Sequence, residues 1–168
     1  VRMTPDPLVV TTGLTVTPDW PAVGQSTTAA FTVKNTSNKP VALQALRAEV
    51  PTVGAFPVQT ATALQPNQTA SYNKSRSFSA TGTYQARAQV QLNSQWLAVL
   101  ADIGQSTEAG FTVMMIATPT LNPIENSDQD GSYQVTWSAV SGATSYRLLE
   151  DDDPNFGSPQ VVYEASGT

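Results

Sequence analysis

The amino-acid sequence predicts an all-β chain that folds as a β-sandwich. About seven short stretches alternate between apolar and polar residues, which is the period of a strand with one buried face. Clusters of Pro, Gly, Asn and Ser separate these stretches, as turns between strands require. The sequence shows no stretch with the period of an amphipathic helix.

Each expected strand ends at a group of residues that favours a turn. Two prolines and Gly24 separate the first strand from the second, and a cluster from Asn35 to Pro40 follows the second. Residues 64–68, with a central proline, make the next strong turn. The strands expected in this part are Leu14–Val16, Ala29–Val33, Val41–Val50, a weaker Phe56–Ala63 and Thr69–Phe78.

The clearest strand runs from Tyr84 to Leu92. Its apolar residues alternate with Gln and Arg throughout, as a half-buried antiparallel strand requires. Asn93 and Ser94 then form the expected tip of a β-hairpin. A last strand is expected over Ala109–Ile116, with Phe111 and Val113 on one side.

The length of this hairpin loop decides which residues of the returning strand are buried. Partners directly opposite each other share a face of the sheet. A two-residue loop therefore points Leu97, Val99 and Ala101 inward, and it leaves Trp96 and Leu100 on the outer face. A three-residue loop reverses this assignment.

The composition argues against catalysis. The chain has no histidine and no cysteine, and only 12% of its residues are charged. Those two residue types supply most general bases, activated nucleophiles and tight metal ligands, so we expect no enzyme, no catalytic residue and no cofactor. The acidic residues of the first part are scattered over turns and strand ends: Asp6, Asp19, Glu49, Asp102 and Glu108.

Charge is distributed unevenly along the chain. Residues 1–117 carry seven basic and five acidic side chains, whereas residues 118–168 carry one basic and eight acidic ones. This step predicts two units with those bounds. The lack of clustered Lys and Arg argues against a nucleic-acid partner. No apolar run approaches the roughly 18 residues of a membrane span, so we expect a chain that does not span a membrane.

The same composition suggests a compartment. Ser, Thr, Gln and Ala take the place of charged residues, which suits a secreted sandwich with an uncharged polar surface. The absence of cysteine argues against a small eukaryotic secreted scaffold and fits an exported bacterial protein. We therefore expect an extracellular or cell-surface location.

Four short motifs lie in the first unit: VGQS at residues 23–26, FTVKNT at 31–36, LQPNQT at 64–69 and GTY at 82–84. Through them, residues 8–115 resemble bacterial immunoglobulin-like modules related to the cell-adhesion-related (CARDB) domain. This resemblance implies an immunoglobulin-like β-sandwich. It also implies that the motifs form structural loops and that no catalytic residue is carried over.

The YQVTWSAVSGATSYRL sequence of residues 133–148 is similar to the first half of a fibronectin type III domain. In that family a Trp and a Tyr on neighbouring strands pack into the core, which implies such positions for Trp137 and Tyr146. Residues 118–168 are fewer than the roughly 90–100 of a complete sandwich, so we expect a partial, fibronectin type III-like β-sandwich. Its open edge would favour contact with another domain of the polypeptide or self-association.

One candidate site is an acidic run in the second unit. Asp151, Asp152, Asp153 and Asn155 supply the hard oxygen ligands that calcium prefers. The spacing of an EF-hand loop is absent, however, and the run falls where the family has an exposed loop between strands. A solvated loop is therefore the favoured interpretation.

The other candidate site is aromatic. Trp20, Trp96 and Tyr72 could form a ligand-binding platform on which sugar rings stack. In the favoured alternative Trp20, beside Pro21, closes one end of the sandwich, and Trp96 packs against the second unit.

These observations favour a non-catalytic structural or interaction module, either a spacer or an adhesion domain, within a larger exported bacterial protein. The alternative is a carbohydrate- or cell-wall-binding accessory module of a secreted hydrolase. The expected partners are other domains of the same polypeptide and, under the alternative, a polysaccharide or the cell wall.

Overall fold

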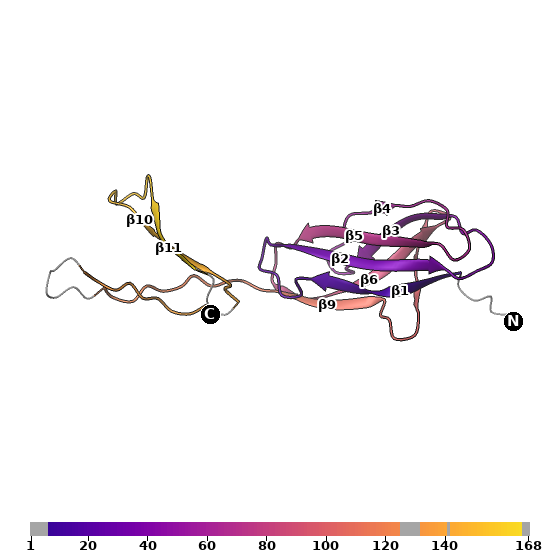
Figure 1. The fold of residues 1–168 in the computed structure, drawn as a ribbon, viewed down its shortest axis with the longest axis horizontal. Coiled ribbons are helices and arrows are strands. Elements are labelled where there is room, and N and C mark those ends of the chain that lie inside the picture. Colours follow the sequence, from indigo (N-terminus) through magenta and orange to yellow (C-terminus); the bar gives the residue numbers. More distant parts are fainter. Residues whose placement is uncertain (1–6, 125–131, 141, 166–168) are drawn as a thin grey trace. The chain divides into compact units, whose positions relative to one another are not determined.

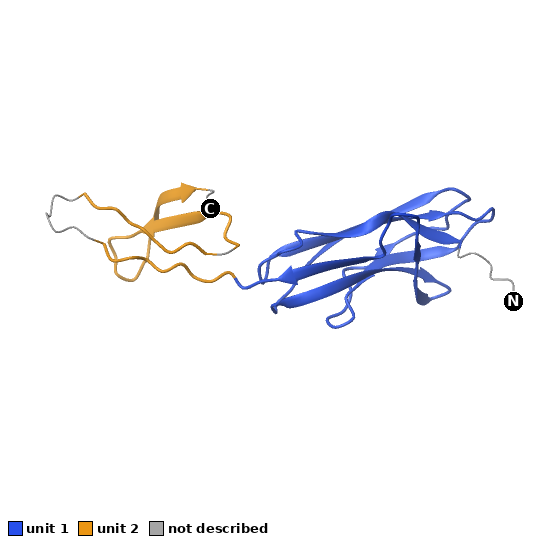
Figure 2. Cartoon of the chain, turned by 90° about the horizontal axis from the view of Figure 1, so that it is seen from below, with its two compact units in different colours: residues 1–115 blue, residues 116–168 orange. Residues whose placement is uncertain are grey.

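The computed structural model describes residues 7–124, 132–140 and 142–165. These residues form strands, turns and irregular segments, and none of them lies in a helix. The chain divides into two compact units, residues 1–115 and 116–168, coloured blue and orange in Figure 2. The strands are β1 (Leu8–Thr17), β2 (Ser26–Asn35), β3 (Leu43–Glu49), β4 (Gln59–Thr60), β5 (Thr69–Ser77), β6 (Gly82–Leu92), β7 (Gln95–Ala98), β8 (Leu100–Ala101), β9 (Glu108–Val113), β10 (Tyr146–Glu150) and β11 (Gln160–Ala165).

The first unit is an immunoglobulin-like β-sandwich, as the sequence predicts (Figure 1). One sheet has the strand order β5-β2-β1-β8, and the other has the order β4-β3-β6-β7 with β9 also paired to β6. Nearly all pairs are antiparallel, and the short pairing of β1 with β8 is parallel. Each sheet therefore places one face against the other sheet and one face toward solvent.

The alternation of the sequence explains which residues the sandwich buries. Along β2 every second residue from Thr27 to Asn35 is buried, and the residues between them are partly exposed. Along β6, Ala86, Ala88 and Val90 are buried between the polar residues that face outward. Because side chains alternate across a strand, this period of two produces a single closed core.

Aromatic rings fill two parts of this core. Phe31 and Tyr72 stack with their ring centroids 4.9 Å apart. Phe56, Phe78 and Phe111 form a second group, with centroids 5.0 to 6.5 Å apart. Burial of such rings supplies a large part of the hydrophobic free energy of a small sandwich.

The hairpin of β6 and β7 has the predicted two-residue loop. Residue 90 pairs with residue 97, and both loop residues, Asn93 and Ser94, have positive φ angles, as a tight hairpin turn requires. Val99 is buried as expected, but Leu97 is 42% exposed because β7 is a four-residue strand at the edge of its sheet. Ala101 is exposed as well, contrary to expectation, because β8 leaves this sheet and pairs with β1.

Asn35 is a fully buried polar residue at the end of β2. Its Nδ2 group donates to the carbonyl oxygens of Lys39 and Leu64, at 2.8 and 2.9 Å. Its Oδ1 atom accepts from the backbone N–H and the hydroxyl of Ser37, at 2.9 and 2.7 Å. The amide thus satisfies four hydrogen bonds, which offsets the cost of burying it.

The backbone of Asn35 joins two of the sequence motifs. Its N–H donates to the carbonyl of Gln68, and its carbonyl accepts from the N–H of Asn67, each at 2.9 Å. Asn67 has a φ angle of 65°, which lets the loop turn back toward β2. The FTVKNT and LQPNQT motifs of residues 31–36 and 64–69 are therefore two halves of one structural corner.

The second unit is built differently. β10 and β11 form a two-stranded antiparallel sheet, and segments around Leu121 and Trp137 meet in an isolated bridge. The Trp137 ring contacts Tyr146 and Tyr163, with centroids 5.7 and 5.5 Å apart. Within the residues described for this unit, none is buried, so these rings contact one another without forming a closed core.

Candidate functional site

Trp96 lies on the outer face of the β3–β6–β7 sheet, where the predicted loop length places it. The Arg47 guanidinium lies over the Trp96 ring, 4.3 Å from its centroid. Arg47 Nε also donates to Gln89 Oε1 at 2.9 Å, because residues 47 and 89 pair across β3 and β6. Trp96 is therefore partly buried, with one side of its ring occupied by a cation.

Charged side chains continue this outer face in pairs. Arg47 meets Glu49 at 3.0 Å, and Arg87 meets Glu108 at 3.1 Å. Gln85 Nε2 donates to the same Glu108 carboxylate at 2.7 Å. We call these residues, together with Gln89 and Trp96, the polar face. Its charges are matched in separate pairs, one within β3 and one between β6 and β9, instead of converging on a common point.

Tyr72 does not belong to an exposed platform. It is only 1% exposed, because its position on β5 points it at Phe31 inside the sandwich. Its hydroxyl donates to the carbonyl of Pro57 at 2.9 Å. Burial raises the pKa of Tyr72 to about 12, against a smaller opposing hydrogen bond from the backbone of Ala48. The prediction of Tyr72 as an accessible stacking residue is wrong.

Trp20 lies in the loop between β1 and β2 and is 60% exposed. The neighbouring Pro21 is fully buried, so it is the proline and not the indole that fills this end of the sandwich. Among the residues that the structure describes, no ring contact joins Trp20, Tyr72 and Trp96 to one another. The sequence therefore selects two accessible tryptophans but not a shared platform.

The acidic run follows β10 as an exposed loop. The Asp151 carboxylate accepts backbone N–H groups of Asp153 and Ser158, at 3.0 and 2.7 Å. The hydrogen bonds from these backbone groups lower the pKa of Asp151. Asp153 likewise accepts from the backbone and side-chain amides of Asn155, at 2.9 and 3.1 Å.

Through these hydrogen bonds the carboxylates of Asp151 and Asp153 bind groups of their own loop. Across residues 7–124, 132–140 and 142–165, no three His, Cys, Asp or Glu side chains gather closely enough to hold a metal ion. The calcium ligands suggested at Asp151, Asp152, Asp153 and Asn155 are therefore not assembled in this structure. Asp6, one of the scattered acids, lies outside the described residues.

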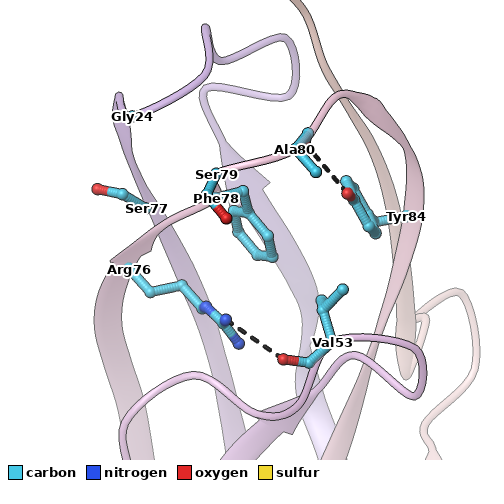
Figure 3. Close-up of a pocket in the computed structure, with 8 residues that line it drawn as sticks. All are labelled: Gly24, Val53, Arg76, Ser77, Phe78, Ser79, Ala80 and Tyr84. Carbon is cyan, nitrogen blue, oxygen red and sulfur yellow. Dashed lines mark hydrogen bonds between the residues drawn. The ribbon is translucent and has the colours of Figure 1, made fainter.

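A pocket that the sequence did not reveal lies at one end of the first unit (Figure 3). It has a volume of about 450 Å³. The loop from Ser77 to Ala80 forms one wall, and Arg76, Val53 and Tyr84 form others. The signal available in the sequence was slight: Arg76 is a charged residue at an inward-pointing position of β5, two residues before the buried Phe78.

Comparison with known proteins gives neighbours of low similarity. No protein-family model and no curated protein sequence matches the chain. Two solved structures of the CARDB domain of the PF1109 protein of Pyrococcus furiosus are similar to it. The solution structure is 20% identical with a TM-score of 0.46, covering 65% of this chain and 94% of that one. The crystal structure, in complex with di-metal ions, is 19% identical with a TM-score of 0.45, covering 68% and 96%.

A third similar structure is the alkylpurine DNA glycosylase AlkC of Pseudomonas fluorescens, bound to DNA containing an abasic site analog. It is 16% identical with a TM-score of 0.45, and the match covers 66% of this chain. The chain spans 31% of the length of that glycosylase. No helix among the described residues is long and apolar enough to cross a membrane. The resemblance of residues 133–148 to a fibronectin type III domain stays a prediction.

Proposed function

We propose that the chain is a non-catalytic structural and interaction module of a larger exported bacterial protein. The observation that carries this proposal is that the residues of its sequence motifs form hydrogen bonds within the fold. Asn35 joins the FTVKNT and LQPNQT motifs through three hydrogen bonds and makes three more to Ser37 and Lys39. These residues therefore hold the sandwich together instead of facing a substrate. The acids of the polar face are likewise engaged with arginines.

An assay of hydrolysis tests the non-catalytic part of this proposal. The full chain is incubated with soluble and insoluble polysaccharides and with peptides, alongside Glu49→Gln and Glu108→Gln variants. We expect no turnover above the buffer rate from any of the three proteins. Turnover that Glu108→Gln abolishes would contradict the proposal, because it would assign chemistry to a carboxylate held in an ion pair.

The polar face favours a second candidate function, which is carbohydrate binding by an accessory module. Trp96 lies there beside Gln89 and Arg47, and planar amide and guanidinium groups donate well to sugar hydroxyls. Since Arg47 occupies one side of the ring, a sugar could stack only on the other side.

A pull-down on insoluble glycans separates the two functions. Trp96→Ala is compared with the parent chain, and Trp20→Ala is the matched control because Trp20 is an exposed tryptophan on a different loop. Under the accessory-module function Trp96→Ala loses the bound fraction and Trp20→Ala keeps it. Equal retention of all three proteins, or retention of none, rejects a sugar site at Trp96 and leaves the structural module.

A further inference from the structure

The pocket at the end of the first unit is formed where three loops meet (Figure 3). The β1–β2 loop supplies Gly24, the β3–β4 loop supplies Val53, and the end of β5 with the following loop supplies Ser77 to Ala80. A side chain added at Gly24 would meet no atom within 4 Å, so the backbone there is open to an approaching molecule. The volume of about 450 Å³ is within the range of small-ligand sites in proteins.

Arg76 is held in one orientation beside this pocket. Its Nη1 group donates to the carbonyls of Gly54 and Ala55, at 2.7 and 3.0 Å, and its Nη2 group donates to that of Val53, at 3.3 Å. The guanidinium also lies over the Phe78 ring, 4.6 Å from the centroid. A cation fixed by three carbonyls and a ring is preorganised, which lowers the entropy lost when it binds a ligand.

The charge of Arg76 is not matched by the protein. Arg47, Arg87 and Arg147 each form an ion pair with a glutamate. Arg76 forms no ion pair with any carboxylate in the described parts of the chain. A guanidinium has five N–H donors, and the three bonds to carbonyls leave the Nε–H and one Nη2–H without a partner in the described structure. A carboxylate is the partner whose planar geometry fits such a pair of donors.

The rest of the pocket offers hydroxyl groups and apolar surface. The Ser79 side chain is exposed, and in the described structure its hydroxyl has no hydrogen-bond partner. The Ser77 side chain points away from Arg76, because neighbouring residues of a strand face opposite sides (Figure 3). The Tyr84 hydroxyl donates to the Ala80 carbonyl at 3.1 Å, so its oxygen can still accept a bond. Val53 and the Tyr84 ring add apolar surface that suits the C–H groups of a pyranose.

We propose that this pocket binds an acidic saccharide, with the carboxylate of a uronic acid on Arg76 and a sugar hydroxyl on Ser79. This goes beyond the proposed function, because it assigns a ligand class to a site that the polar face does not include. It does not depend on Trp96, so its failure and that of a Trp96 sugar site are distinguishable.

The test is an NMR titration of the ¹⁵N-labelled full chain. One series adds oligogalacturonate, and the other adds a neutral cello-oligosaccharide of equal length. We expect saturable amide shifts around residues 76–80 with the acidic sugar and binding at least about ten-fold weaker with the neutral one, since a hydrogen-bonded charge pair has that order of effect. Affinity for oligogalacturonate should also fall as salt is raised.

Two variants at Ser79 keep the test independent of folding. Ser79 is exposed and its side chain makes no bond, so Ser79→Glu and Ser79→Gln should both fold normally. The introduced carboxylate repels the ligand, so Ser79→Glu should weaken binding about ten-fold or more. The neutral Ser79→Gln removes only the hydroxyl contact and should weaken binding about three-fold. Arg76→Ala should abolish binding.

The proposal is overturned if acidic and neutral sugars bind equally or if neither binds. It is also overturned if Ser79→Glu and Ser79→Gln behave alike. Acetate is the final probe: shifts from acetate at the same concentrations as oligogalacturonate would reduce the pocket to a simple anion site and reject saccharide recognition.

Discussion

The two units of this chain share an all-β design but differ in what they bury. In the first unit, residues from both sheets have less than a tenth of their surface exposed, including Phe31, Leu46 and Phe111. In the described part of the second unit, the Trp137 ring contacts Tyr146 and Tyr163, yet none of the three is buried. Ring contacts alone therefore do not make a core.

The reason for the difference is the number of strands. In the first unit β6 has β3 on one side and β7 and β9 on the other, and a second sheet covers its inner face. The described part of the second unit has one two-stranded sheet and an isolated bridge. A two-stranded ribbon is marginally stable by itself in water, because it buries too little apolar surface to offset the entropy of ordering the chain.

Truncation of one large ring in each unit should give the largest contrast. Phe31→Ala should lower the free energy of unfolding by about 3–5 kcal/mol, because it leaves a cavity beside Tyr72. Trp137→Ala should leave the same main transition unchanged, because that transition belongs to the first unit. Urea unfolding followed by circular dichroism measures both. Equal shifts from the two variants would show that the second unit shares the core.

The buried amide at the corner between the two motifs should have the next largest effect. Asn35→Ala should cost about 2–4 kcal/mol of unfolding free energy, because it leaves buried partners such as the Leu64 carbonyl without a donor. The matched control is Asn73→Ala, since that side chain is exposed on β5, and its effect should stay within about 0.5 kcal/mol. Thermal unfolding distinguishes them. Similar melting temperatures for both variants would remove Asn35 from its structural role.

Alkaline pH should weaken the first unit through Tyr72. Its pKa is raised from 10.0 to about 12 by burial, so the folded state keeps a proton that the unfolded state releases. This contribution is fully present below pH 10 and is lost as the pH rises through 12, at most about 3 kcal/mol. Unfolding free energies of the parent chain and of Tyr72→Phe between pH 9 and pH 12 measure it. A parallel decline in both proteins would mean that another group is responsible.

Strict alternation made much of the first unit predictable from its sequence. The strand from Tyr84 to Leu92 and the hairpin tip at Asn93 and Ser94 are predicted correctly, because a period of two and an Asn-Ser turn are local signals. Of the two registers that the sequence leaves open, the structure has the one with a two-residue loop. Leu97 is exposed although the two-residue loop predicts that it points inward. The reason is that burial at a sheet edge depends on what lies beyond the edge. The pairing of β8 with β1 joins residues 9 and 100, and no local pattern indicates a contact over that distance.

The candidate sites were less predictable than the fold. Tyr72 lies among polar residues on β5, so alternation alone did not show which of the two faces it occupies. Arg76 shares the face of Tyr72, and its role depends on carbonyls of the β3–β4 loop that the sequence does not bring near it. Such sites arise from tertiary contacts between loops, which composition and spacing do not encode.

Amide hydrogen exchange on the full chain measures the difference in burial between the two units most directly. If only the first unit has a closed core, amides of Ala29–Val33 and Ala86–Val90 should exchange only through global unfolding. Amides of β10 and β11 should exchange faster by orders of magnitude, because local opening there exposes little new apolar surface. Equal protection in β6 and β11 would contradict the claim that the second unit buries no core.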